Sequence, residues 1–354
     1  MSKYIDLNHP IAPTEYIDAL KKRDISTAAG LKPWSLNETL ELMDKNDISA
    51  SVLSISEPGV YLSGKDTSLQ FAKELSHQMN EICARIISDN PQRFGAFAAL
   101  PLPDTGASLK ELEYAFDVLK LDGVSLFSNY DGYYLGDPKF DALFSELNRK
   151  HAVVFIHPSA PPVNAKSHLN LPDGMLEAYF DITRTVFSLM VNGVTKKYPD
   201  IRFILGNAGG ATPYMAARVG ITAAMSADLP GVINTVVDIM NFMYSLSAKG
   251  KEKMPETIKY FVRLKSNVLP DGPDFYLKKF YYDTALSASP YAFLSLQTLI
   301  DSSKIVFGTG GSLKTQEIIP STIQGLNEYA GFNEKDRAAI GRDNALNLIP
   351  RLKA

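Results

Sequence analysis

The sequence predicts an α/β protein whose eight parallel strands close into a (β/α)8 (TIM) barrel, with helical insertions after the first and sixth strands. Two observations support this prediction: eight short apolar runs recur along the chain, and a stretch with a helical pattern follows each of them. Strands that alternate with helices form parallel βαβ units. Eight such strands, buried on both faces, favour a closed barrel over an open sheet.

The expected strands follow one another at eight places. They are YIDLN (4–8), ASVLSIS (50–56), RFGAFAALP (93–101), DGVSLFS (122–128), AVVFIHP (152–158), RFILGNAGG (202–210), KFYYDTA (279–285) and KIVFGTGG (304–311). Two longer stretches between them, residues 10–47 and 211–278, contain helical patterns and are the expected insertions. No linker, charge block or repeat divides the chain, so we predict one domain over residues 1–354.

The composition is that of an ordinary soluble globular protein, with 45% hydrophobic and 21% charged residues. A net charge of −3 offers no electrostatic attraction to nucleic acid or to an anionic membrane. The sequence has no apolar run of the roughly 18 residues that a membrane span needs, and its first residues lack the apolar region of a signal peptide. Cys83 is the only cysteine, which excludes an intrachain disulfide. We therefore expect a cytoplasmic protein that binds a small molecule, with neither nucleic acid nor membrane as a partner.

In a (β/α)8 barrel the carboxyl ends of the strands face one mouth, where active sites are built. Polar residues stand at most of the predicted strand ends. They are Asn8, Glu57, Asn129, Asp131, His157, Asn207 and Asp283, and Gly310 ends the eighth strand. We expect the functional side chains among them.

The last predicted strand runs into a glycine-rich stretch, IVFGTGGSLKT (305–315), which invites comparison with a phosphate-binding loop. That loop needs a glycine directly before its Lys-Ser/Thr pair, so that the backbone can approach the phosphate closely. Counted from Gly308, this position carries Leu313. The stretch is therefore interpreted as a strand end and not as a nucleotide site.

Longer motifs make the chain resemble a known family. They are IDLNHPIAPTEY, KPWSLNETLELMDKNDISASVLSISEPG, RFGAFAALPLPD, YYLGDPKFDALFSELNRKHAVVFIHP, TRTVFSLMVNGVTKKYPDIRFILGNAGGATPYMAARV, FYYDTALSASP and KIVFGTGGS. Over nearly its whole length the chain is similar to the amidohydrolase-related barrels that include the aminocarboxymuconate-semialdehyde, γ-resorcylate and 6-methylsalicylate decarboxylases. The resemblance implies the barrel fold, decarboxylase-type chemistry and a homodimer, for which residues 211–278 offer apolar helices.

The resemblance also implies a divalent metal ion. The family holds it with a first-strand His-x-His or Glu-x-His, a fifth-strand His and an eighth-strand Asp, and a His after strand six acts as acid/base. The fifth-strand ligand is kept here as His157. The other positions carry Asn8, Pro10, Asn207 and Gly310. His9 stands between the first two, where strand alternation should point its side chain away from the mouth.

These replacements bear directly on metal binding. Imidazole and carboxylate are the usual ligands of zinc-type ions, and a stable site normally needs about three of them. Because one imidazole remains, we predict a pocket without a metal ion and without another cofactor. A hard cation held loosely by His157, Asn8, Glu57 and water is the alternative.

Three side chains are candidates for acid/base catalysis. His157 is the principal one, because it is the histidine placed at a strand end and imidazole titrates near neutral pH; otherwise it is a hydrogen-bonded remnant of the metal site. Asp283 could orient His157, act as a base itself, or cap the helix that follows. Glu57, at the end of the second strand, could be a carboxylate acid/base.

Five further residues are candidates for binding the substrate. The amides of Asn8 and Asn207 could donate hydrogen bonds to a carboxylate, a carbonyl or a developing oxyanion. Arg184 has the fork that clamps a carboxylate, unless it forms a surface or intersubunit salt bridge. Trp34 and Tyr61 would form an aromatic wall for a flat ring, unless they belong to the core.

The sequence thus predicts a metal-independent lyase that acts on a small aromatic or polyketide-like acid by non-oxidative decarboxylation or related proton transfer. A general acid near neutral pH and a dry pocket favour this chemistry even without a metal ion. One alternative is a non-catalytic homologue that binds a small ligand or a catalytic partner. Another is a cyclase, hydratase or hydrolase that uses the same pocket.

Overall fold

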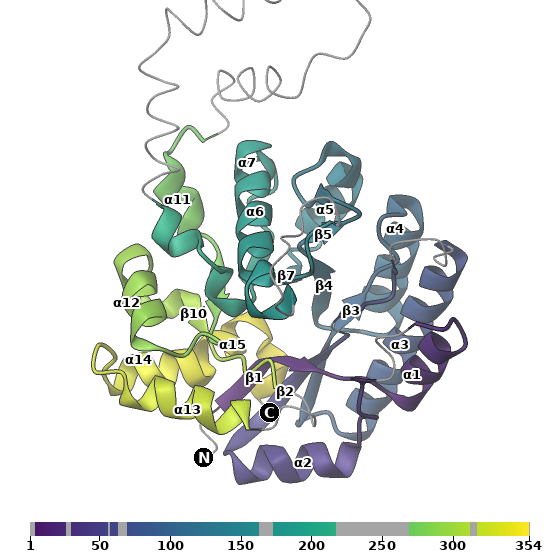
Figure 1. The fold of residues 1–354 in the computed structure, drawn as a ribbon, viewed down its shortest axis with the longest axis horizontal. Coiled ribbons are helices and arrows are strands. Elements are labelled where there is room, and N and C mark those ends of the chain that lie inside the picture. The colour runs from purple at the N-terminus through teal and green to yellow at the C-terminus, as the bar shows by residue number, and fades with distance from the viewer. Residues whose placement is uncertain are drawn as a thin grey trace, which may run out of the picture.

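The computed structural model describes residues 4–25, 30–55, 57–62, 69–162, 173–216, 269–311 and 317–353. Eight parallel strands form one sheet in the order β1-β2-β3-β4-β7-β8-β9-β10, with helices around it (Figure 1). The strands are β1 (Tyr4–Pro10), β2 (Ile48–Ser54), β3 (Phe94–Ala99), β4 (Gly123–Phe127), β7 (Val153–His157), β8 (Arg202–Leu205), β9 (Tyr281–Asp283) and β10 (Ile305–Val306). The predicted (β/α)8 barrel is confirmed, and each predicted strand is present.

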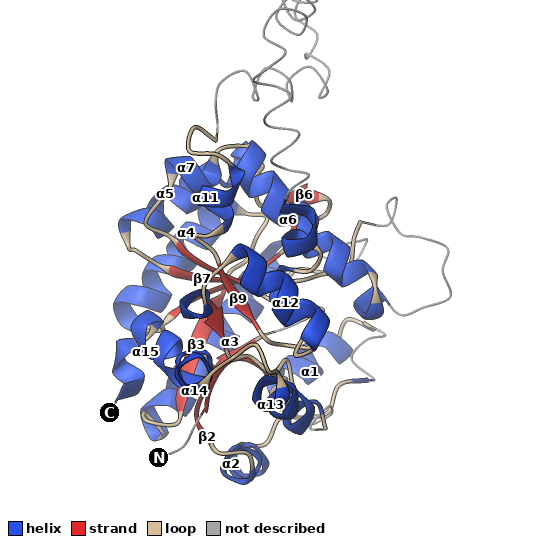
Figure 2. Cartoon of the chain, turned by 90° about the vertical axis from the view of Figure 1, so that its left-hand side faces the viewer, coloured by secondary structure: helices blue, strands red, loops and turns tan. Residues whose placement is uncertain are grey.

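Backbone hydrogen bonds join the last part of the sheet to the first. The N–H of Leu7 donates to the carbonyl of Phe307 at 3.0 Å, and the N–H of Gly310 donates to the carbonyl of Asn8 at 3.0 Å. These bonds connect β1 to the segment that continues β10. They place the end of the eighth strand beside the end of the first, and in Figure 2 the strands lie at the centre of a ring of helices.

The helices are those expected after the strands, with one short hairpin in addition. They are α1 (Thr14–Lys21), α2 (Leu36–Lys45), α3 (Leu69–Asp89), α4 (Thr105–Glu113), α5 (Asp141–Arg149), α6 (Glu177–Val191), α7 (Val194–Lys197), α11 (Pro273–Leu277), α12 (Pro290–Leu299), α13 (Ile318–Glu328), α14 (Glu334–Ala338) and α15 (Asn344–Leu348). The unpredicted hairpin pairs β5 (Asn129–Tyr130) with β6 (Tyr133–Tyr134) directly after β4. It carries polar side chains over the end of that strand.

The first predicted insertion is helical, since α1 and α2 lie between β1 and β2. Local chemistry explains where α2 begins: the hydroxyl of Ser35 accepts a hydrogen bond from the N–H of Glu38, as an N-cap does. Of the second insertion, residues 217–268 lie outside the described residues. The predicted dimer surface at 211–278 falls largely in that range and stays a prediction.

Two apolar clusters pack the barrel. The inner one contains Leu7, Phe97 and Phe155, and the rings of the two phenylalanines stack with centroids 5.8 Å apart. Leu348 and Leu352 from the carboxyl-terminal segment belong to the same cluster. This segment is hydrogen-bonded to the amino-terminal ends of strands. For example, the guanidinium of Arg202, at the start of β8, donates to the carbonyl of Leu348. That end of the barrel is therefore covered by the carboxyl terminus of the chain, and the polar strand ends lie at the other.

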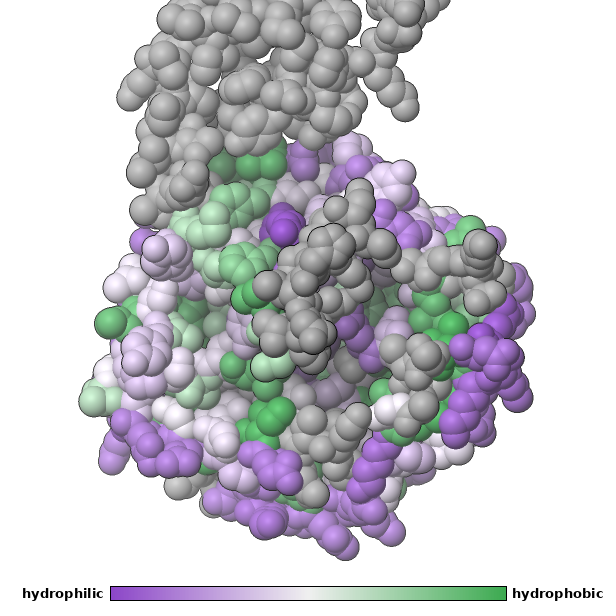
Figure 3. Space-filling model, viewed as in Figure 1, coloured by the Kyte–Doolittle hydropathy of each residue, from purple (hydrophilic) through white to green (hydrophobic). Residues whose placement is uncertain are grey.

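The outer cluster fills the layer between the sheet and the helices. On the face shown in Figure 3, hydrophilic residues gather along the lower edge, over α2. Among the described helices, none has both the length and the apolar character that crossing a membrane requires.

Candidate active site

The first strand is irregular at the point where it reaches the mouth. Asp6 pairs with Ser51 of β2 and His9 pairs with Leu53, so three steps on β1 face two steps on β2. Such a bulge re-aims the side chains that follow it. Leu7 packs in the inner cluster, whereas His9 turns to Asp6, with 3.4 Å between its Nδ1 and the carboxylate Oδ2. His9 thus lies on the side of Asp6 and not on that of Leu7. Simple alternation from Leu7 would place it inside, so the bulge explains its position.

The amide of Asn8 is bonded to the carboxylate of Asp283, at the ends of β1 and β9. Nδ2 of Asn8 donates to Oδ2 of Asp283 at 2.8 Å, and both residues are buried. The backbone N–H groups of Ala208 and Ala285 donate to Oδ1, at 3.4 and 3.1 Å. Oδ1 of Asn8 is buried without a hydrogen-bond partner among the residues described. The pair therefore keeps one acceptor available for a ligand.

The environment of Asp283 shifts the pKa of its carboxyl group to a value near neutral pH. Burial raises the pKa of this carboxyl from 3.8 to about 7, and the negative charge of Asp6 adds to the increase. The hydrogen bonds from Asn8, Ala208 and Ala285 act in the opposite direction and keep the increase moderate. Asp283 can consequently both donate and accept a proton at physiological pH.

Glycines of the eighth strand end pack against this pair. A Cβ on Gly308 would lie 3.0 Å from Cβ of Asn8 and 3.0 Å from Oδ2 of Asp283. A Cβ on Gly310 would lie 3.9 Å from Nδ2 of Asn8, and Gly310 has a positive φ of 61°. A side chain at position 310 would thus start beside Asn8. This placement agrees with the interpretation that the family's eighth-strand ligand and first-strand ligand stood at these two positions.

His157 ends β7, and its ring is held by its own chain. Nδ1 lies 2.7 Å from the carbonyl oxygen of Pro158 and must donate to it, since a carbonyl only accepts. The neutral ring therefore carries its proton on Nδ1 and leaves Nε2 as an acceptor. Burial lowers the pKa of His157, which favours the neutral form. The rings of Phe127 and Phe155 lie 5.8 and 6.2 Å away.

The turn after β8 is built from four consecutive residues with positive φ, from Asn207 to Gly210. Asn207 is buried. Gly210 is required by space, because a Cβ there would lie 2.1 Å from the carbonyl of Tyr179 on α6. The next residue, Ala211, donates its N–H to the hydroxyl of Thr183, also on α6, at 2.9 Å. The glycines thus serve the docking of the turn on α6, and this turn also presents the N–H of Ala208 to Asp283.

The other predicted residues lie in separate surroundings. Glu57 is exposed and accepts a bond from the N–H of Ala160, at 2.6 Å, which ties the loop after β2 to the loop after β7. The hydroxyl of Tyr61 donates to Asp131 at 2.5 Å. Trp34 contacts Phe94 edge to face, with centroids 6.3 Å apart, and packs on the outer cluster.

Two interpretations from the sequence change with this geometry. Asp283 does not orient His157 through a hydrogen bond in the described structure, because Nδ1 of that ring is bonded to Pro158. Arg184 pairs with a carboxylate of this chain, since its Nη1 lies 3.8 Å from Oδ1 of Asp181. The alternative of a salt bridge, left open from the sequence, is the one observed.

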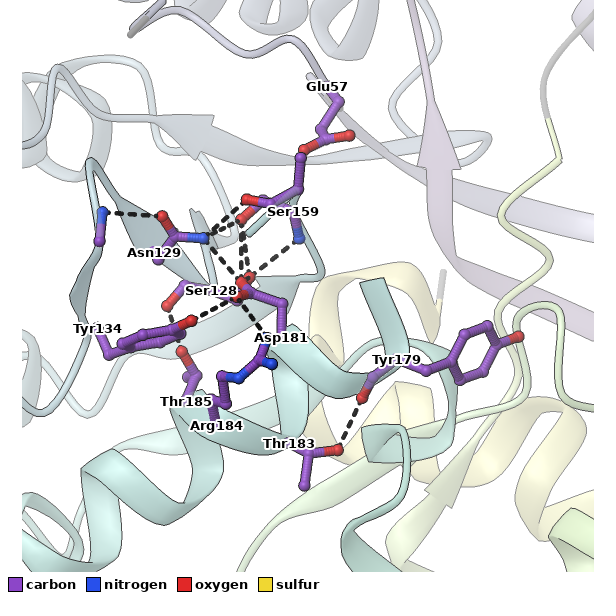
Figure 4. A network of polar contacts seen from close by, with 12 residues as sticks. Glu57, Ser128, Asn129, Tyr134, Ser159, Tyr179, Asp181, Thr183, Arg184 and Thr185 are labelled. Carbon is purple, nitrogen blue, oxygen red and sulfur yellow. Dashed lines mark hydrogen bonds and ion pairs between the residues drawn. The ribbon is translucent and has the colours of Figure 1, made fainter. Parts of the chain in front are cut away.

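Asp181, which is fully buried in α6, is not among the residues predicted from the sequence. It accepts hydrogen bonds from the hydroxyl of Ser128, from Nδ2 of Asn129 at 2.8 Å and from the hydroxyl of Tyr134 at 2.7 Å (Figure 4). A signal was present in the sequence. Asp181 shares a helix face with Ala178 and other buried residues of α6, and a carboxylate on a buried helix face must find partners.

The donors at the mouth do not fit the divalent metal ion of the family. Within the described residues, no group of three or more His, Cys, Asp or Glu side chains is arranged to hold a metal ion. Asn8 can offer only its neutral Oδ1, and Pro10 and Gly310 have no side-chain ligand atom. A site of the zinc or manganese type needs more imidazole or carboxylate ligands than these positions supply.

Known proteins of similar sequence are decarboxylases. The chain is 28% identical over 353 residues to 6-methylsalicylic acid decarboxylase of Penicillium expansum. This alignment covers 99% of the present chain and 97% of the relative. It is 24% identical over 324 residues to gamma-resorcylate decarboxylase of Rhodococcus jostii, covering 88% and 86%. The prediction of a carboxy-lyase agrees with these relatives.

Solved structures share the fold. A dihydroxybenzoic acid decarboxylase from Polaromonas sp. JS666, solved with bound manganese and the inhibitor 2-nitroresorcinol, superposes with a TM-score of 0.75 at 20% identity, over 100% of this chain and 98% of that one. The amidohydrolase family model matches residues 31–351 of the present chain. Because this match spans most of the sequence, the protein belongs to the amidohydrolase family.

Proposed function

We propose that this protein is a carboxy-lyase that decarboxylates a small aromatic or polyketide-like acid non-oxidatively and without a divalent metal ion. The observation that supports the proposal is the buried Asn8–Asp283 pair at the barrel mouth, in which burial raises the pKa of the carboxyl group to about 7. Two relatives are named as decarboxylases of aromatic acids, which supports the substrate class.

Asp283 is the proton donor in this proposal. Its carboxyl proton goes to the ring carbon that bears the substrate's carboxylate, and the bond between that carbon and the carboxylate then breaks. The electron pair of this bond returns to the ring, carbon dioxide leaves, and the hydrogen stays on the product. Asp283 is left as a carboxylate that Asn8 and the N–H groups of Ala208 and Ala285 stabilise. A proton from solvent restores the acid.

His157 takes the complementary role. With its proton held by the carbonyl of Pro158, the neutral ring presents Nε2 as an acceptor. A hydroxyl group next to the substrate's carboxylate would donate to this nitrogen and send electron density into the ring, which makes the neighbouring carbon easier to protonate. The environments of His157 and Asp283 shift their pKa values in opposite directions, which separates base from acid. The acid role expected of His157 from the sequence therefore passes to Asp283.

The test uses purified full-length protein with its metal content measured by elemental analysis. The protein is dialysed against a chelator and incubated with 6-methylsalicylate, 2,6-dihydroxybenzoate and a set of β-keto acids, and carbon dioxide and the decarboxylated product are quantified. We expect turnover that survives chelation. One tightly held equivalent of zinc or manganese whose removal abolishes turnover would contradict metal independence. Thermal stabilisation by these acids without turnover would favour the non-catalytic binder.

The homodimer implied by the family is also a proposal. Sedimentation equilibrium of the full chain measures it directly, with a mass of twice 38.9 kDa as the expected result.

A further inference from the structure

A second buried carboxylate lies close to the mouth but outside the proposed acid/base pair. Asp181 of α6 is fully buried, and Figure 4 shows side chains from the ends of β4 and β7 converging on it. Its Oδ2 accepts from the hydroxyl of Ser128 and from Nδ2 of Asn129, and its Oδ1 accepts from the hydroxyl of Tyr134. A buried charge of this kind requires such donors, because leaving it unpaired would be costly.

Ser128 and Asn129, which follow β4, are also hydrogen-bonded to the backbone at the end of β7. The N–H of Ser128 donates to the carbonyl of His157 at 3.0 Å. The hydroxyl oxygen of Ser128 accepts from the N–H of Ser159 at 2.9 Å. Nδ2 of Asn129 donates to the carbonyl of Ala160 at 3.0 Å as well as to Asp181. The backbone on both sides of Pro158 is thereby fixed to β4.

The direction of these bonds follows from the charge of Asp181. A carboxylate can only accept, so the single hydroxyl proton of Ser128 points to Asp181. The oxygen of Ser128 is then left to accept, both from the N–H of Ser159 and from the hydroxyl of Ser159, which lies 2.8 Å away. That N–H belongs to the same rigid peptide unit as the carbonyl of Pro158. This carbonyl accepts the Nδ1 proton of His157 at 2.7 Å.

We propose that Asp181 is a positioning residue that sets the ring tautomer and orientation of His157, acting through Ser128 and the peptide unit between Pro158 and Ser159. The catalytic effect of Asp181 rests on the proposed function, in which Nε2 of His157 accepts a hydrogen bond from the substrate. Helix α6 also bonds the backbone of Ser128 directly, because the hydroxyl of Thr185 donates to the carbonyl of Ser128.

The decisive variant is Asp181→Asn. An amide in this place brings two N–H donors to a site already occupied by the donors of Ser128, Asn129 and Tyr134, so at least one bond is lost or reversed. The proton of Ser128 is then free to turn, and the peptide unit loses its fixed partner. We expect kcat to fall about tenfold, with a smaller change in KM, as for other groups that orient a catalytic imidazole.

The tautomer of the His157 ring can be measured directly, independently of turnover. The chain has five histidines, so ¹⁵N-histidine labelling gives few signals, and His157→Gln identifies the one of interest. In the unchanged protein we expect a ring protonated on Nδ1. In Asp181→Asn, and in Ser128→Ala, we expect a mixture of tautomers. Ser128→Ala keeps the carboxylate, with its donors Asn129 and Tyr134, and removes the hydroxyl that connects it to Ser159. It therefore tests the inference if Asp181→Asn fails to fold.

A matched control separates positioning from general stability. Asp122 is also a buried carboxylate, bonded to Arg351 at 2.6 Å and to the N–H of Ala96, at the amino-terminal end of the barrel. We expect Asp122→Asn to lower the melting temperature and to leave both kcat and the His157 tautomer unchanged. A His157 tautomer unaffected by Asp181→Asn and Ser128→Ala would overturn the inference. If no acid is turned over but the tautomer responds, the inference about Asp181 stands and the proposed function fails.

Discussion

Two of the fully buried carboxylates near the barrel mouth, Asp283 and Asp181, have different surroundings. Asp283 is contacted by one amide side chain and two backbone N–H groups, and Gly308 packs against it so closely that a Cβ there would lie 3.0 Å from its Oδ2. Asp181 is enclosed by four side-chain donors, from Ser128, Asn129, Tyr134 and Ser159, and by a neighbouring guanidinium. Burial alone therefore does not decide what a carboxylate does. In the proposed mechanism the first exchanges a proton, whereas the second holds the ends of β4 and β7 together.

The two regions also differ in which residue types they use. Around Asp283 the positions that carry metal ligands in the family hold small or neutral residues, Asn8 and Gly310. None of the positions matched to the family's ligands carries a carboxylate, so none of them has to be neutralised in the absence of a cation. Around Asp181 the side chains are polar and mutually bonded. The contrast indicates a pocket whose chemistry was changed inside a framework that still holds its shape.

The largest expected effect comes from Asp283→Asn. This change keeps the shape of the side chain and removes the proton donor, so we expect kcat to fall by about 100-fold or more. Circular dichroism and the melting temperature check that the fold is kept. Full activity of this variant would remove Asp283 from the mechanism and sharpen the case for Glu57 or His157 as the acid.

The same variant reveals the raised pKa through stability. The pKa of Asp283 is about 7 in the folded protein, against an ordinary value of 3.8. Between these values the folded chain keeps a proton that the unfolded chain releases, so the contribution of this group to stability falls as the pH rises from about 4 to about 7. Urea unfolding at several pH values should therefore show Asp283→Asn gaining stability relative to the unchanged protein over this range. A difference that is independent of pH would rule out the raised pKa.

An intermediate effect is expected from Gly308→Ala. Its Cβ would lie 3.0 Å from both Asn8 and Asp283, so it must push the pair apart. Overpacking of this kind costs about 1–3 kcal/mol in the free energy of unfolding, and we expect kcat to fall as well. Gly106→Ala in α4 is the control, since its Cβ would meet one oxygen of Asp104 at 3.6 Å. Equal losses of activity in both variants would show that Gly308 has no special relation to the pair.

The smallest effect is expected from Arg184→Gln. The Arg184 side chain is 43% exposed, and its guanidinium lies 3.8 Å from Asp181, which has four other donors. Ion pairs exposed to this extent contribute about 0–1 kcal/mol. The melting temperature and KM should therefore change little. A large increase in KM with unchanged kcat would show that Arg184 binds the substrate carboxylate after all.

Local sequence patterns were enough to predict the barrel and the end of it that carries the chemistry. Apolar runs such as AVVFIHP are local patterns, and a strand followed by a helix can bury such a run in essentially one way. The strand ends at Asn8, His157 and Asp283 could therefore be named from these patterns, whereas the replacement of the family's ligands was inferred from the resemblance to the family. Helices with clear caps, such as α2 after Ser35, follow from the same local chemistry.

Which of these residues act together depends on long-range contacts that local patterns do not contain. Asn8 and Asp283 are 275 positions apart and meet because the barrel closes between β10 and β1. The bulge in β1 that accompanies this contact has no local signature in the sequence. Asp181 lies 53 positions from Ser128, and its partners come from another strand end. Hydrogen bonds of buried carboxylates arise only when the chain is folded, and the pKa of Asp283 and the tautomer of His157 depend on them in turn.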